Sequence, residues 1–427
     1  MVIIGIGYVG LPLAIAFAES GFVVHGLDIN AERVARVNAA DSYIKDISSE
    51  TLAAAIRRPS TGGYLEATTE FDVINDADVV IITVPTPLSK TRHPDLSHIV
   101  ATVEQVATRV RPGMLVVLQS TTYPGTTHEL VLPRLLEARQ PAMMVGQDLF
   151  VAFAPERVDP GRTDWNIRNT PKVVGGETAA CLRVASALFQ AIVQTVVPVG
   201  SPAEAEMVKL LENTFRATNI ALVNEVAIMC DRLGLNVWNV ISAAATKPFG
   251  FMKFTPGPGI GGHCIPTDPQ YLAWKLRSLN YEARFVGLAE EINLAMQDHV
   301  VEKVTLALND AGKPVRGSRI LCLGVAYKPD IGDIRESPAL AVIHKLADRG
   351  ADIAYHDPYV AHVNEDGLDM HSVDLDEHRL GETDCVVLLT AHSNFDWDWI
   401  IKHCRLVVDT RNATAGFENG SCRVVGI

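Results

Sequence analysis

A single cysteine stands inside a cluster of glycines and prolines. Cys264 lies in the segment Gly257–Asp268, which reads GPGIGGHCIPTD. Glycines let a backbone approach a ligand closely, so this loop would leave the thiol at its rim. Asp268 follows four residues after Cys264 and shares its face if the segment is helical. A thiol attacks only as the thiolate, so such a site also needs a base or a lowered pKa. The pattern indicates a nucleophilic cysteine, and a small buried packing residue is the alternative.

A lysine and an asparagine are spaced for one face of a helix. Lys209 and Asn213 stand at i and i+4 in EMVKLLEN, and this spacing brings side chains together. An ammonium and an amide side by side can hold a developing oxyanion and position a water. The alternative is an ordinary solvated helix face. Glu204, Glu206 and Glu212 on the same stretch carry only that second interpretation.

A glycine-rich turn near the start has the pattern of a dinucleotide site. Gly5, Gly7 and Gly10 form GIGYVG between an apolar strand and a helix. In such a turn the first glycine permits the bend, the second admits a pyrophosphate, and the third allows helix packing. Asp28 ends the next strand, where a carboxylate accepts from ribose hydroxyls and repels a 2′-phosphate. NAD is therefore favoured over NADP, although Arg33 is a cation that would suit that phosphate. A glycine turn that binds another nucleotide, or no ligand, is the alternative.

Other polar groups follow predicted strands, where open α/β sheets bind ligands. Glu156 in APERVDPG suits a general acid or base, or a surface charge, and Ser120–Gly125 offers hydroxyls that orient a water. Pro85–Pro87 would fix a loop beside the dinucleotide. Lys328 and Arg411 are cations of the kind that recognise phosphate. The thirteen histidines show no metal-ligand spacing, so no metal site is predicted.

The elements that must position these groups alternate between short apolar strands and longer helical patterns, which is typical of an α/β fold. Ala203–Leu233 is predicted as a long helix, and Glu282–Ala311 as a second one. We predict two Rossmann-like doubly wound domains joined by the long central helix and a helical connector. Their expected ranges are 1–199 for NAD binding, 200–299 for the helical domain with the cysteine loop, and 300–427 for the second Rossmann-like domain. The predicted strands are Met1–Gly5, Phe22–Asp28, Val79–Val84, Leu115–Gln119, Phe150–Ala154, Lys172–Gly175, Val193–Val197, Ala351–His356, Asp384–Leu389 and Leu406–Asp409. Gly317–Tyr327 is predicted to start the strand–helix series of the second half.

Composition excludes several classes of function. The chain has 427 residues, with 50 acidic against 37 basic side chains and a net charge of −13, a balance that disfavours nucleic-acid binding. Its longest apolar runs, such as Val79–Val84, fall far short of a membrane span. Seven cysteines without a C-x-x-C pair indicate a reducing compartment rather than a disulfide framework. We therefore expect a soluble, cytoplasmic, multidomain protein without nucleic-acid or membrane partners.

These motifs, in this order, resemble the UDP-glucose/GDP-mannose dehydrogenase family across essentially the whole chain. The matching segments are Gly5–Pro12, Val84–Pro87, Ser120–Thr127, Lys209–Asn213, Gly261–Asp268 and Arg335–Pro338. Within that family, PERVDPG at Pro155–Gly161 and AAATKPFGF at Ala243–Phe251 are similar to the UDP-N-acetylglucosamine 6-dehydrogenases of bacterial surface-polysaccharide synthesis.

The resemblance implies an NAD-dependent, four-electron oxidation of the sugar C6 alcohol to a carboxylate, with two NAD and one water. Cys264 would attack the intermediate aldehyde, and the thiohemiacetal would yield a thioester that is then hydrolysed. By the same resemblance, Lys209 and Asn213 would stabilise the oxyanions. Asp268 would activate water or the thiol.

The remaining family roles concern proton transfer and binding. Glu156 would serve in proton transfer and hydrolysis, and Thr121 would hold the catalytic water. The implied cofactor-binding residues are Gly5, Gly7, Tyr8, Val9, Gly10, Asp28, Arg33, Pro85, Thr86, Thr121 and Arg335. The implied residues for the UDP-sugar are Glu156, Arg157, Lys209, Asn213, Phe249, Gly261, Lys328 and Arg411. The family also implies a homodimer through Ala203–Leu233.

The chain departs from the UDP-glucose enzymes, which carry a second glutamate four residues after the position of Glu156. Pro160 stands there in this sequence, so strict glucose specificity is not predicted. The same chemistry on UDP-N-acetylmannosamine, UDP-glucose or GDP-mannose remains open. Two further alternatives are a single hydride transfer without covalent chemistry and an NAD-binding regulator without turnover. The residues that contact the N-acetyl group are not predicted, because loops brought together by folding build that pocket.

Overall fold

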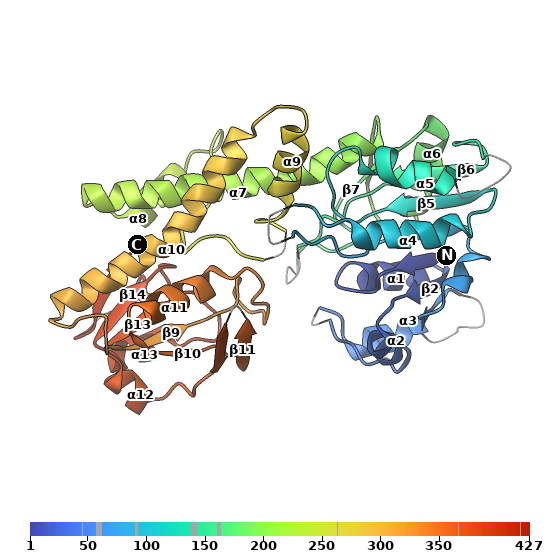
Figure 1. Cartoon of the computed structure of the whole chain (residues 1–427). Helices are drawn as coiled ribbons and strands as arrows, with labels where there is room; N and C mark the ends of the chain where they lie inside the picture. Colours follow the sequence, from blue (N-terminus) through green and yellow to red (C-terminus); the bar gives the residue numbers. More distant parts are fainter. Residues whose placement is uncertain are drawn as a thin grey trace. The chain divides into compact units, whose positions relative to one another are not determined.

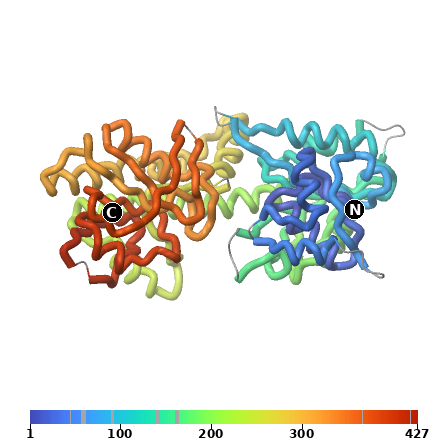
Figure 2. Tube along the Cα trace, turned by 90° about the horizontal axis from the view of Figure 1, so that it is seen from below, coloured from blue at the N-terminus to red at the C-terminus, as the bar shows by residue number. Residues whose placement is uncertain are grey.

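The computed structural model describes residues 1–44, 46–56, 62–89, 93–137, 143–159, 164–262, 264–365, 367–418 and 420–427. Pro160, where the sequence departs from the UDP-glucose enzymes, lies outside the described residues. The chain forms two compact units: unit 1 comprises Met1–Glu212 and Gln270–Tyr281, and unit 2 comprises Asn213–Pro269 and Glu282–Ile427. In Figure 2 the blue N-terminal end belongs to unit 1 and the red C-terminal end to unit 2.

Unit 1 is built on one sheet, whose described strands follow the order β3-β2-β1-β4-β5-β6-β7-β8. Figure 1 labels β2, β5, β6 and β7 of this sheet. Neighbouring strands from β3 through β6 are parallel, β7 runs antiparallel to β6, and β8 is parallel to β7. This order, which reverses beside β1, is that of a dinucleotide-binding Rossmann fold. The predicted α/β class is confirmed, together with the extended far edge. The bounds are β1 (Val2–Ile4), β2 (Val23–Leu27), β3 (Tyr64–Thr68), β4 (Val79–Ile82), β5 (Met114–Leu118), β6 (Leu149–Phe153), β7 (Lys172–Gly176) and β8 (Val196–Val199).

Helices cover both faces of this sheet. Alternate strand residues divide between two apolar cores, so that Ile3 and Val117 pack with α1, α3 and α6, whereas Val2 and Val116 pack with α4 and α5. Strands buried on both faces read as continuous apolar runs rather than alternating ones, which is why the sequence shows them clearly. The bounds are α1 (Gly10–Glu19), α2 (Ala31–Asn38), α3 (Ser49–Ile56), α4 (Ser97–Ala107), α5 (Leu132–Glu137) and α6 (Ala179–Gln190).

One predicted strand of this sheet is displaced. The sequence predicts Val193–Val197, but β8 spans Val196–Val199. The reason is the end of α6, after which the N–H groups of Ile192 and Val193 still donate to the carbonyl of Phe189. The chain therefore completes a turn before it becomes extended.

Two long helices, α7 and α10, and two short ones, α8 and α9, follow the sheet. Helix α7 (Pro202–Leu233) continues from unit 1 into unit 2 and matches the predicted helix to within one residue. It ends at Gly234, whose φ of +67° closes a helix without strain at a β-carbon. Helix α10 (Arg284–Asp310) confirms the second predicted helix, whereas α8 (Val237–Ala244) and α9 (Asp268–Arg277) have no predicted bounds. Of the helices described, none combines the length and apolar character that a membrane crossing requires.

Unit 2 carries a second parallel sheet, whose described strands follow the order β10-β9-β13-β14-β15 (Figure 1). The three strands predicted for this half are present as β10, β13 and β14, and β9 lies in the segment predicted to start the series. The short hairpin and the edge strand β15 were not predicted, because their segments are polar or very short. The bounds are β9 (Arg319–Leu323), α11 (Pro338–Asp348), β10 (Asp352–His356), β11 (His362–Glu365), β12 (Leu368–His371), α12 (Glu377–Glu382), β13 (Cys385–Leu388), α13 (Trp397–His403), β14 (Leu406–Asp409) and β15 (Arg423–Gly426).

Candidate functional site

The glycine turn between β1 and α1 has the geometry that a pyrophosphate requires. Gly5 has a φ of +93°, and a β-carbon there would lie 2.9 Å from the carbonyl oxygen of Thr83. A β-carbon on Gly10 would collide with the carbonyl oxygen of Gly5, whereas one on Gly7 would meet no described atom within 4 Å. Gly5 thus permits the bend of the chain, Gly10 permits close packing of the helix, and Gly7 leaves room for a ligand to approach the backbone. The glycines of a dinucleotide-binding turn have the same three roles. The residues present fit NAD.

Asp28 fixes the ribose end of this turn. Its Oδ2 accepts from the Ile6 N–H at 3.1 Å and its Oδ1 from the Asn30 N–H at 2.9 Å. Arg33, the cation that would suit a 2′-phosphate, instead lies with its guanidinium 3.6 Å from Asp28 Oδ2. Tyr43, which the sequence analysis missed, donates its hydroxyl to the carbonyl of Ile6. The Asp28 carboxylate therefore stabilises the glycine turn through the Ile6 N–H. Its negative charge at the ribose position favours NAD over NADP.

The loop of Pro85 and Thr86 is held from a helix distant in sequence. Thr86 is buried and Pro85 exposed. The hydroxyl of Tyr271, a fully buried residue of α9, donates to the Thr86 carbonyl at 2.5 Å. Tyr271 packs with Tyr123 and Leu210. This support was missed, since nothing in the sequence links a helical tyrosine to a loop 185 residues away.

Glu206 holds the loop that carries Thr121, and its predicted solvated position is wrong. The side chain is fully buried. Its carboxylate accepts from the Gly125 N–H at 2.5 Å, the Thr127 N–H at 2.9 Å and the Thr127 hydroxyl at 2.7 Å. Burial raises the pKa of Glu206 to about 7, against the opposing effect of these hydrogen bonds. Thr121 itself is half-buried at the start of this loop, directly after β5.

Glu156 accepts four hydrogen bonds from described residues. Its Oε1 receives the Arg157 and Val158 N–H groups at 2.8 and 2.9 Å. Its Oε2 receives Gln119 Nε2 at 3.0 Å and Lys172 Nζ at 3.2 Å. Burial pushes the pKa of Glu156 upward, but the Lys172 ammonium and the backbone N–H groups outweigh it and hold the pKa below its ordinary value. Glu156 is thus held as a carboxylate, which suits accepting hydrogen bonds.

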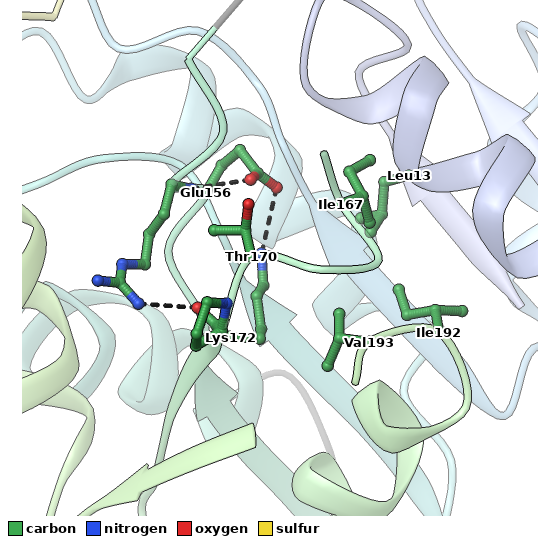
Figure 3. Close-up of a pocket in the computed structure, with 9 residues that line it drawn as sticks. Leu13, Glu156, Ile167, Thr170, Lys172, Ile192 and Val193 are labelled. Atoms are coloured by element: carbon green, nitrogen blue, oxygen red, sulfur yellow. Dashed lines mark hydrogen bonds and ion pairs between the residues drawn. The ribbon is translucent and has the colours of Figure 1, made fainter. Parts of the chain in front are cut away.

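Lys172, on β7, is the partner that sequence analysis missed. Figure 3 shows it facing Glu156, with Thr170 beside them. The two side chains are only 7% and 17% exposed. The small cavity next to them, lined also by Leu13 and Ile192, measures about 10 Å³. That is about the room of one water molecule, so the cavity does not accommodate a sugar.

Arg157 is committed to an ion pair within unit 1. Its Nε and one terminal nitrogen lie 3.2 and 2.5 Å from the carboxylate of Glu212, and its other nitrogen donates to the Pro171 carbonyl at 2.8 Å. Glu212 on α7 is therefore paired rather than solvated as predicted. Lys209 lies one helical turn before it and is half-buried. The charges of Lys209 and Arg157 contribute, after burial, to lowering the pKa of Lys172.

The cysteine loop belongs to unit 2, and three predicted catalytic residues are linked there. Cys264 is exposed. The N–H of Asp268, at the start of α9, donates to the Cys264 carbonyl at 2.8 Å. Nδ2 of Asn213 donates to Asp268 Oδ2 at 2.5 Å, and Asp268 is buried. The structure therefore joins the loop of the thiol to α7 through a buried carboxylate.

The glycines before Cys264 let the loop pack closely against other parts of unit 2. A β-carbon on Gly261 would lie 2.7 Å from the carbonyl oxygen of Glu336, and one on Gly262 would lie 2.8 Å from the Tyr327 ring. The N–H of Gly262 donates to the Arg335 carbonyl at 3.0 Å. The motif RESP at 335–338 thus supports the cysteine loop through its backbone.

The predicted ligands of phosphate and cofactor in unit 2 have different surroundings. Arg411 donates from Nε to the Leu389 carbonyl at 2.8 Å, and burial lowers its pKa to about 10. The side chain of Arg335 is exposed and pairs with Asp333 at 2.6 Å. The remaining two predicted ligands are the half-buried Lys328 and the exposed Phe249.

Profiles of one protein family match three consecutive parts of the chain. The NAD binding domain of the UDP-glucose/GDP-mannose dehydrogenase family matches residues 1–193, its central domain matches 203–295, and its UDP binding domain matches 321–416. With the glycine turn and the sheet order, these matches define an NAD-dependent oxidoreductase of UDP-sugars. The chain belongs to the UDP-glucose/GDP-mannose dehydrogenase family, as its resemblance predicts.

Individual relatives share this class but differ in sugar. The chain is 34% identical over 394 residues to the UDP-N-acetyl-D-glucosamine 6-dehydrogenase of Salmonella typhi, covering 92% of this chain and 90% of that one. It is 34% identical over 420 residues to the NDP-N-acetyl-D-galactosaminuronic acid dehydrogenase of Ralstonia solanacearum, covering 96% and 95%. The solved structure of the UDP-D-ManNAc dehydrogenase from Pyrococcus horikoshii matches with a TM-score of 0.85 at 32% identity, covering 100% and 99%. The reaction class is therefore shared, and the sugar is not decided by similarity.

Breaking the buried pair of Glu156 and Lys172 should destabilise the protein. Lys172→Met leaves a buried carboxylate without its ammonium, which typically costs about 3–5 kcal/mol. Urea unfolding at pH 7 measures the loss. The double variant Glu156→Gln/Lys172→Met removes both charges and should recover a large part of it. Equal losses in the single and double variants would contradict the pairing.

The raised pKa of Glu206 predicts a pH-dependent stability. A folded pKa of about 7 against the ordinary 4.5 means that the folded state retains a proton that the unfolded state has lost. The stabilisation is therefore full below pH 4.5 and lost as pH rises through 7. Between pH 5 and 8 the wild type should lose about 2–3 kcal/mol relative to Glu206→Gln, as measured by urea unfolding at each pH. A constant difference across that range would show that Glu206 does not titrate in this way.

Proposed function

We propose that this chain oxidises the C6 alcohol of UDP-N-acetylglucosamine to the uronic acid, consuming two NAD and one water. The observation that carries the proposal is the exposed Cys264, whose loop is tied through Asp268 to Asn213 in a member of this family. The motif PERVDPG and the Salmonella typhi relative support the N-acetylglucosamine assignment. The product would be a precursor of surface polysaccharide, made in the cytoplasm, where the thiol stays reduced.

When bound at the turn of Gly5, Gly7 and Gly10, NAD would supply the hydride acceptor that each of the two oxidations of C6 needs. The alcohol first loses its hydroxyl proton to water held at the Thr121 loop and becomes an aldehyde. The Cys264 thiolate then adds to that aldehyde, forming a C–S bond and an alkoxide. Amide and ammonium donors from Asn213 and Lys209 stabilise this oxyanion. Loss of the second hydride gives a thioester, which water cleaves to the acid and the free thiol.

Two carboxylates, Asp268 and Glu156, are proposed to take part in the proton steps. Asp268 accepts the Asn213 amide on one oxygen and is proposed to take the proton of the thiol or of the hydrolytic water. Glu156, held as a carboxylate by Lys172, is proposed to polarise a water or a sugar hydroxyl. Lys328 and Arg411 are proposed to contact the diphosphate, and Arg335 the cofactor.

Replacement of Cys264 tests the covalent step. The wild type should release about two NADH per sugar consumed. Cys264→Ala should form no acid above about 1% of the wild-type rate, because the aldehyde is not captured. Cys264→Ser, which keeps the shape but has a poorer nucleophile, serves as the matched variant and should also be strongly impaired. Normal acid formation by Cys264→Ala would refute covalent catalysis and favour hydride transfer without a covalent intermediate.

The preferred sugar is identified by comparing kcat/KM for the candidate nucleotide sugars. The ratio kcat/KM should be highest for UDP-N-acetylglucosamine when it is compared with UDP-N-acetylmannosamine, UDP-N-acetylgalactosamine, UDP-glucose and GDP-mannose. A preference for another of these sugars with two NADH retained would preserve the chemistry and overturn the specificity. No NADH with any sugar would favour the alternative of an NAD-binding regulator.

We also propose that two copies associate along α7. Phe215, Leu222 and Met229 are exposed at seven-residue spacing, and Leu233 continues the same stripe. A sustained apolar seam of this period is the surface on which helices pair. Because the two copies are identical, a two-fold axis can place the same apolar residues of both α7 helices against each other.

A charge placed in that seam tests the dimer. Leu222→Glu should shift the molar mass in light scattering from about twice the chain mass to that of one chain at micromolar concentration, because a buried unpaired carboxylate is costly. Leu306→Glu, on α10, is the matched control, since Leu306 and Leu222 are 53% and 54% exposed. A Leu222→Glu protein that remains dimeric would contradict the proposed interface.

A further inference from the structure

Two asparagines form a buried pair between helices α7 and α10 in unit 2. Asn224 is completely buried and Asn293 nearly so. Nδ2 of Asn224 donates to Oδ1 of Asn293 at 2.8 Å, and Nδ2 of Asn293 donates to the Ala217 carbonyl at 3.2 Å. Buried amides destabilise a core unless their hydrogen bonds are made. Apolar residues would pack the two helices without needing hydrogen bonds. The presence of two buried asparagines therefore needs another explanation.

The remaining acceptor of the pair supports the cysteine loop. Oδ1 of Asn224 accepts the N–H of Gly257 at 2.9 Å, and Gly257 begins the segment that leads to Cys264. The loop then passes close to α10, because a β-carbon on Gly259 would lie 2.9 Å from the carbonyl oxygen of Asn293. Asn224 is thus the side chain that satisfies the buried backbone where the loop starts.

Helix α7 holds the other end of the same loop with a second asparagine. Asn213 donates to Asp268, four residues after Cys264. Asn213 and Asn224 are eleven residues apart, which is close to three full helical turns, so both project from one face about 16 Å apart. The segment that begins at Gly257 and ends at Asp268 is therefore attached at both ends to one face of α7.

We propose that Asn224, oriented by Asn293, is a positioning residue for the Cys264 thiol. Neither amide is placed to touch the substrate. Their effect is to fix the upstream end of the loop, as Asn213 and Asp268 fix the downstream end, so that the thiol is held where the aldehyde forms. The inference rests on the proposed function, because it assigns Asn224 to the second oxidation and not to the first.

The test separates the two oxidations in Asn224→Ala, assayed as the full-length protein with NAD and the preferred UDP-sugar. The first oxidation does not use the thiol and should continue. The second should fall at least tenfold, so that NADH per sugar drops from about two toward one. Hydroxylamine should trap the aldehyde as an oxime, and KM for NAD should stay within twofold. Asn309→Ala, an exposed position on α10, is the matched control and should keep two NADH per sugar.

Asn224→Asp keeps the inference testable if the alanine variant does not fold. Aspartate retains an oxygen for the Gly257 N–H and should restore part of the second oxidation. A folded Asn224→Ala that gives two NADH at the wild-type rate overturns the inference, as does an equal loss of both oxidations, which would indicate a general structural role. If the wild type gives one NADH, or Cys264→Ala gives two, the proposed function itself fails. Failure of the proposed function is therefore seen in the wild type or in Cys264→Ala, whereas failure of the positioning role is seen only in Asn224→Ala.

Discussion

Buried backbone N–H groups must find acceptors, and α7 supplies several of them to the loops of this protein. Within unit 1, Glu206 accepts two amides of the loop that follows β5. Within unit 2, Asn224 accepts the amide that opens the cysteine loop, and Asn213 binds the carboxylate that closes it. Each of these loops is therefore attached to side chains of one continuous helix, which help to fix its conformation.

Much of the fold follows from local pattern. Buried parallel strands appear as short apolar runs, and α7 appears as a long helical pattern that ends at Gly234, so both could be predicted. The edge strand β15 and the hairpin of β11 and β12 could not, because segments of four residues are too short to show a periodicity. The displacement of β8 has a similar origin, since the turn after α6 is set by hydrogen bonds to Phe189 that composition does not encode.

The residues of the candidate site also fall into those that the sequence pattern predicts and those that only the structure shows. The glycine turn, Cys264 and Asp268 could be found because close spacing in sequence encodes their relation, and the link from Asn213 to Asp268 follows once the loop packs on α7. Lys172 and Glu206 were missed because their partners are far along the chain and neither belongs to a motif. A buried charged residue looks like a surface residue until its environment is known. Tertiary structure alone showed that these two are held in the interior.

The attachment of Asp28 has a consequence for how this family changes coenzyme. Arg33 already lies beside the ribose position, so an exchange of preference looks one substitution away. Yet the two oxygens of Asp28 also receive the N–H groups of Ile6 and Asn30, and the first of these belongs to the glycine turn itself. Replacing Asp28 with an apolar residue such as alanine would remove the repulsion of a 2′-phosphate and, at the same time, both acceptors of these N–H groups. In this chain the preference for NAD and the shape of the turn therefore depend on the same carboxylate, so a change in one affects the other.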